Sequence, residues 1–147
     1  MSGFWRNWMK GWCWAVGLFG IVLAGAGFDL TSGPTRFILA LLSGGAVVEL
    51  GAPLRFSVAL LGAVTFGWSL TLLAVVQAAN QLGERGKPIW VLLTGGVAIW
   101  YVIDSILSVA TGFALNAASN TVFMAAFLLP ILRSGVLQGS SRAPRSA

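Results

Sequence analysis

The sequence predicts an all-α integral membrane protein: a bundle of four transmembrane helices plus one short interfacial or re-entrant helix. Hydrophobic residues make up 57% of the 147 residues and charged residues only 9%, whereas soluble proteins carry about 25% charged residues. The apolar residues form runs, most of them near the length of about 20 residues that a bilayer-spanning helix needs. The Lys and Arg residues lie at the ends of these runs. We therefore expect a single bundle over 1–134.

The first span is expected at about 12–32. Three tryptophans, Trp5, Trp8 and Trp12, recur at helical spacing at its start, as in the aromatic belt of a membrane interface. A basic start, an apolar stretch and small residues also fit a cleaved signal peptide. We favour a span because the segments left after cleavage would still cross a membrane.

The next segment is expected to be a short helix at about 35–50 that does not cross the membrane. Pro34 and Pro53, each near a glycine, bound it, and its apolar run of about 14 residues is shorter than a span. The runs at about 54–79, 88–112 and 114–132 are expected to span. The tail at 135–147 is rich in Gly, Ser, Arg and Pro, and we expect it to be a disordered cytoplasmic tail.

The distribution of Lys and Arg decides whether 35–50 crosses the membrane. If it does not, seven basic residues share the side of both termini and two lie on the other side; if it does, the split is six to three. The seven are Arg6, Lys10, Arg85, Lys87, Arg133, Arg142 and Arg145, and the two are Arg36 and Arg55. The positive-inside rule favours four spans in a bacterial inner membrane, with both termini cytoplasmic.

Composition also excludes several kinds of site. The chain has no histidine, and Cys13 is its only cysteine. This removes disulfides within the chain, Cys/His zinc sites and His-dependent catalytic triads. We expect no catalytic residue, metal or cofactor. Nucleic acid is not an expected partner, because the cations end apolar runs and do not form a basic patch on a soluble surface.

The candidate site is a polar cluster around Asp104, an acid well inside a predicted span. Charged groups in a membrane are costly and mark functional candidates, so Asp104 should face the bundle interior. Ser108 follows it by one helical turn, and the short turn near Gly112 should place Ser108 level with Asn116 and Asp104 level with Asn120. The cluster comprises Asp104, Ser105, Ser108, Asn116, Asn120 and Arg55. It fits a polar staple between helices or, alternatively, a proton or cation relay.

Three further features remain open between packing and function. Arg55 fits a snorkelling residue near Glu49, or a partner of Asp104. Trp68 and Trp100 lie near the midplane, where they fit core filling or, as candidate aromatic contacts, a ligand site. Small residues repeat at Ala59, Ala63 and Gly67 and at Gly20 and Ala24. Such repeats allow close helix packing, within the chain or between chains.

Two stretches carry a family resemblance: the run from Leu54 to Trp68, and the run from Trp100 to Asn116 followed by Asn120 and Leu129-Pro130. They resemble an uncharacterised family of small bacterial multi-helix inner-membrane proteins with about four spans. The resemblance covers about residues 54–132 and implies the architecture only.

The leading hypothesis is a non-enzymatic multi-pass protein of unknown activity, acting as a structural or accessory component of a membrane assembly. Its expected partners are the lipid bilayer and either a homo-oligomer or a larger membrane complex. One alternative is a small-molecule or ion transporter subunit with Asp104 in the path, which a water-accessible cavity at Asp104 would favour. Another is a lipid- or quinone-binding protein, which an apolar groove near Trp68 and Trp100 would favour.

Overall fold

The computed structural model describes residues 1–138, and the rest of the predicted tail lies outside the described residues. The long helices are α1 (Gly3–Ala24), α3 (Ala52–Gln81), α4 (Lys87–Ala110) and α5 (Ala114–Ser134), and α2 (Gly33–Leu42) is short. Short 3-10 turns occur at η1 (Gly25–Gly27), η2 (Asp29–Thr31) and η3 (Gly83–Gly86). In the described part of the chain four helices are long and apolar enough to cross a membrane. The predicted fold class is confirmed.

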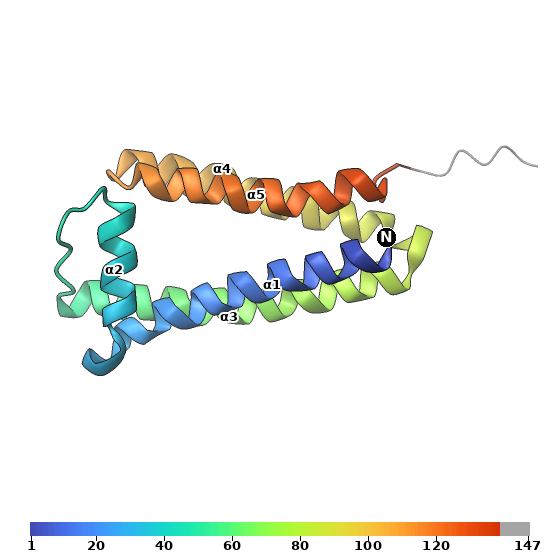
Figure 1. Cartoon of the computed structure of the whole chain (residues 1–147). Helices are drawn as coiled ribbons and strands as arrows, with labels where there is room; N and C mark the ends of the chain where they lie inside the picture. The colour runs from blue at the N-terminus through green and yellow to red at the C-terminus, as the bar shows by residue number, and fades with distance from the viewer. Residues whose placement is uncertain (139–147) are drawn as a thin grey trace, which may run out of the picture.

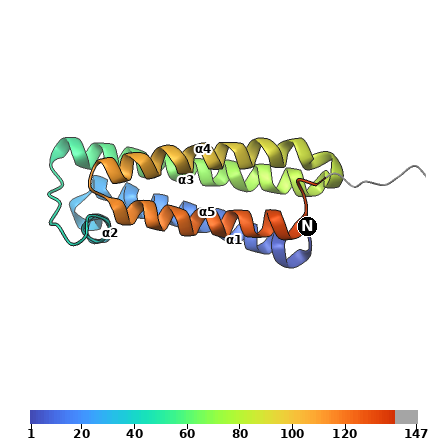
Figure 2. The same cartoon turned by 90° about the horizontal axis from the view of Figure 1, so that it is seen from above.

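The four long helices form two pairs (Figures 1 and 2). Helix α1 runs beside α3, and α4 runs beside α5, while α2 lies across one end of the bundle. The N-terminus and the end of α5 lie together at the opposite end. Both ends of the described chain are therefore on one side, as four spans require.

The contact between α1 and α3 is a close approach of two backbones. A Cβ built on Gly20 would lie 2.6 Å from the backbone nitrogen of Phe66, and one on Gly62 would lie 2.6 Å from the Gly20 carbonyl oxygen. Ala63 and Gly67, by contrast, are exposed, and nothing lies within 4 Å of a Cβ built on Gly67. Gly20 serves packing within the chain. Of the predicted stripe of Ala59, Ala63 and Gly67, only Ala59 packs against buried residues of this chain.

Two helix boundaries differ from the prediction. The first helix begins at Gly3, not near residue 12, and its α-helical part ends at Ala24 rather than near 32. The aromatic side chains of Phe4, Trp5 and Trp8 pack on one another, and Trp8 also bonds to α5. These contacts hold the first turns in helical form, and the tryptophans belong to the helix itself.

The short helix ends at Leu42 rather than near residue 50. Gly44 and Gly45 follow with φ of +77° and +98°, a conformation that a right-handed helix cannot continue. The ten residues of α2 rise about 15 Å, half of the hydrocarbon thickness of about 30 Å. The predicted short apolar helix is confirmed, and it ends earlier than expected.

The buried side chains form two hydrophobic clusters of different composition. The larger cluster lies toward the end of the bundle that holds the N-terminus. It takes residues from all four long helices, including Trp12, Val76, Trp90 and Phe127. The smaller lies under α2. Its buried members are Leu23, Ala26, Leu50 and Val58. Among the described residues it includes none from α4 or α5, so at this end the two helix pairs do not share a hydrophobic core.

Candidate functional site

Asp104, Ser108 and Asn116 form a hydrogen-bonded group that we call the hairpin clamp. The Asn116 amide nitrogen donates to Asp104 Oδ1 at 3.2 Å and to Ser108 Oγ at 2.8 Å. The Ser108 hydroxyl lies 3.1 Å from Asp104 Oδ1 and 2.7 Å from the Asp104 carbonyl oxygen. Asp104 and Asn116 are half-buried and Ser108 is buried. The clamp therefore joins α4 to α5 near the end of the bundle where α2 lies.

The local sequence explains this geometry. Asp104 and Ser108 stand one turn apart on the same face of α4. Thr111 ends the helix, and Gly112 turns the chain with φ +85°, a left-handed conformation that glycine adopts without strain. Helix α5 starts at Ala114, so Asn116 returns within its first turn to the level of Ser108.

Asp104 and Asn120, which were expected at the same depth, are not joined by a hydrogen bond in the described part of the chain. Asn116 reaches both Ser108 and Asp104, because one amide can bond two groups that are one turn apart on the facing helix. Asn120 is only 7% exposed, and its Nδ2 has no hydrogen-bond partner among the described residues. The Ser105 hydroxyl is also buried without a partner there. Three of the six predicted cluster residues, Ser105, Asn120 and Arg55, thus lie outside the clamp's bonding.

The midplane tryptophans contact each other. The rings of Trp68 on α3 and Trp100 on α4 have centroids 5.8 Å apart at an interplanar angle of 49°. Both side chains pack against the larger hydrophobic cluster. An aromatic pair of this kind contributes about 0.5 to 1.5 kcal/mol beyond its burial, so the pair helps to join the two helix pairs.

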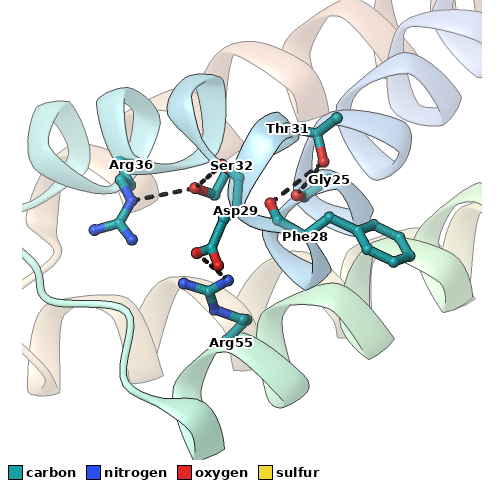
Figure 3. Close-up of polar contacts among 7 residues, drawn as sticks. All are labelled: Gly25, Phe28, Asp29, Thr31, Ser32, Arg36 and Arg55. Carbon is teal, nitrogen blue, oxygen red and sulfur yellow. Dashed lines mark hydrogen bonds and ion pairs between the residues drawn. The ribbon is translucent and has the colours of Figure 1, made fainter.

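Arg55 belongs to a separate network near α2 (Figure 3). Its guanidinium forms an ion pair with Asp29 at 2.5 Å. The Ser32 hydroxyl donates to the Asp29 carbonyl oxygen and accepts a bond from Arg36 Nε at 3.3 Å. Arg55 therefore pairs with Asp29 and not with Asp104, the alternative that the sequence left open, since η2 places Asp29 above the start of α3. The Asp29 side chain is 84% exposed, and an exposed pair is worth about 0 to 1 kcal/mol.

Sequence reasoning missed how α1 is fixed to α5. The indole N–H groups of Trp8 and Trp12 donate to the carbonyl oxygens of Ala126 and Phe123, both at 2.9 Å. Trp12 also packs on the Phe123 and Phe127 rings. The available signal was the spacing of Trp8 and Trp12, which puts two indole donors on one face of α1.

Two grooves at the surface lie away from Trp68 and Trp100. One apolar groove of about 430 Å³ runs between α1 and α5 beside Trp8 and Trp12. Another of about 530 Å³ lies between α4 and α5 and is lined by Ser105, Ile106 and Ala117 among others. Neither is lined by Trp68 or Trp100. Within residues 1–138 no group of three His, Cys, Asp or Glu side chains is placed to hold a metal ion.

Comparison with known proteins adds no relative. No protein family model, no curated protein and no solved structure matches the chain.

Proposed function

We propose that this protein is a structural or accessory component of a membrane assembly, in the inner membrane of a bacterium, and not an enzyme. The observation that carries the proposal is an exposed face of α3. Small residues repeat along that face at intervals of three or four. They are Ala63, Gly67, Thr71, Ala74 and Ala78, and all five are exposed. We call them the small-residue face of α3.

The small-residue face lies on the side of α3 away from α1. The buried residues of α3, among them Gly62, Ser69 and Val76, occupy the opposite side of the helix by helical periodicity. In the most apolar 18-residue stretch of α3, only 17% of the residues are buried within the chain. In the corresponding stretch that includes α4, the share is 11%. Small residues let two helix backbones approach closely in a membrane, so this face suits a partner helix better than it suits lipid chains.

The clamp supports the same proposal over a relay. Asp104 Oδ1 accepts bonds from Ser108 and Asn116 within its own hairpin, an arrangement suited to holding two helices together. Each such bond contributes about 0.6 kcal/mol in membrane proteins.

Leucine at position 67 should separate the protein from its assembly without unfolding it. A Cβ at Gly67 meets nothing within 4 Å, so Gly67→Leu should leave the monomer's thermal stability unchanged. The larger side chain should prevent close approach of a partner helix. Co-purification in mild detergent and native gel electrophoresis measure the effect. The matched control is Gly96→Leu on α4, where nothing lies within 4 Å of a Cβ either. An unchanged complex in the Gly67→Leu protein would contradict the proposal.

The proposed orientation places both termini in the cytoplasm. It rests on the seven-to-two division of basic residues between the two sides. A reporter fused to the N-terminus and one fused after Arg133 should both read as cytoplasmic, because the N-terminus and the end of α5 lie on the same side. Two periplasmic readings would invert the orientation, and opposite readings would mean that the number of spans is wrong.

A further inference from the structure

Asn120 is a buried polar side chain that no group in the described chain satisfies. It is 7% exposed, and its Nδ2 lacks a hydrogen-bond acceptor. Buried amides that lose their partners destabilise a fold, and in a membrane no bulk water can serve in their place. The unpaired Nδ2 of Asn120 therefore points to a bond with something outside the described chain.

The surroundings of Asn120 are suited to a small polar molecule. The residue lies one turn from Asn116 and two turns from Phe127 on the same face of α5, so it points into the bundle. On this half of α4 and α5 many of the buried or half-buried side chains are polar, among them Asp104, Ser108, Asn116 and Asn120. The hydrophobic cluster under α2 includes none of them. At this end, the interior is therefore polar toward α4 and α5 and apolar toward α1 and α3.

The available groups restrict the chemistry of such a molecule. The amide N–H of Asn120 needs an acceptor, which a simple cation does not offer. An anion would face the acceptor oxygens of Asp104, while the described Lys and Arg residues lie at the ends of the long helices or near α2. A neutral oxygen, from a hydroxyl or a carbonyl group, satisfies both conditions.

We propose that Asn120 binds the neutral oxygen of a small guest between the two helix pairs, next to the hairpin clamp. The guest is water or a small hydroxyl- or carbonyl-bearing molecule. The proposal goes beyond the assembly role proposed above and does not depend on it, since the small-residue face of α3 and Asn120 lie on different helices.

Replacing Asn120 with leucine tests the proposal directly. If the amide had no guest, the nearly isosteric apolar side chain would remove an unsatisfied group and keep or raise the thermal midpoint. With a guest, Asn120→Leu should lower the midpoint by about 3 °C or more. Asn116→Leu is the control for sensitivity, because it removes two observed bonds. An unchanged or raised midpoint for Asn120→Leu overturns the proposal.

Thiol labelling gives an independent measurement and also decides the matter if the leucine variant does not fold. In a Cys13→Ser background, Asn120→Cys should react with methyl methanethiosulfonate about tenfold faster than Phe127→Cys, which sits in the fully buried core. The reaction requires the thiolate, which forms only where water or polar groups reach the sulfur. Equal rates overturn the proposal.

Native mass spectrometry then shows whether the guest is water or a larger molecule. A neutral adduct on the wild type that is lost in Asn120→Leu identifies a larger guest, and no adduct identifies water.

Discussion

Replacing Gly62 with leucine is expected to prevent the bundle from folding. A Cβ there would lie 2.6 Å from the Gly20 carbonyl oxygen and 2.7 Å from the Leu23 carbonyl carbon, and closer still to the Ala24 nitrogen. All three are backbone atoms, which cannot move aside by changing a rotamer. The whole of α1 would have to shift from α3, at a cost of about 3 kcal/mol or more.

The effect can be measured as the yield of monodisperse protein in detergent and as its thermal midpoint. Gly67→Leu is the matched control on the same helix, since a Cβ at Gly67 meets nothing within 4 Å. Gly62→Ala should already be destabilised, because the first added carbon makes the clash. A Gly62→Leu protein as stable as Gly67→Leu would show that α1 and α3 are not in backbone contact.

Replacing Asp104 with leucine should lower stability in detergent by about 1 to 3 kcal/mol. The change removes the acceptor of Ser108 and Asn116 at Oδ1 and leaves the Asn116 amide with fewer partners. Asp104→Asn keeps an oxygen at this position while removing the charge, so its stability should remain close to that of the wild type. Thermal unfolding of the purified proteins measures both effects.

Ile103→Leu is a suitable control for the Asp104 variants, because Ile103 is a neighbouring side chain on α4 that is 54% exposed. A relay predicts another result. Asp104→Asn would then abolish a transport activity as fully as Asp104→Leu while stability hardly changed. Equal destabilisation by asparagine and leucine would contradict the clamp, since it would mean that the oxygen bonds contribute nothing.

The hairpin shows how far spacing carries a prediction. The matching depth of Ser108 and Asn116 follows from the position of Gly112, and their 2.8 Å bond confirms it. The same count placed Asp104 level with Asn120, but the hydrogen bond to Asp104 comes from Asn116. Counting residues fixes depth to within about one turn of 5.4 Å, but a hydrogen bond forms over about 3 Å. The choice between Asn116 and Asn120 depends on side-chain reach, which only the packed hairpin defines.

The ends of the elements show the same limit. The prolines and glycines around α2 predicted a separate short helix, because their backbone preferences are local. The stop at Leu42 depends on Gly44 and Gly45 taking positive φ, and the early start of α1 depends on the contacts of Trp8 with α5 and with Phe4.

The sequence by itself determined that this protein has four spans and one short helix, since hydrophobic length, breakers and flanking charge each act within one segment of the chain. The tertiary structure alone decided which helices pair. Small residues occur on several helix faces, among them Gly20, Gly62 and Gly67. Only the first two bring backbones together within the chain, while Gly67 stays exposed. The physical reason is that close packing depends on two complementary surfaces at once, and periodicity along one helix describes only one of them.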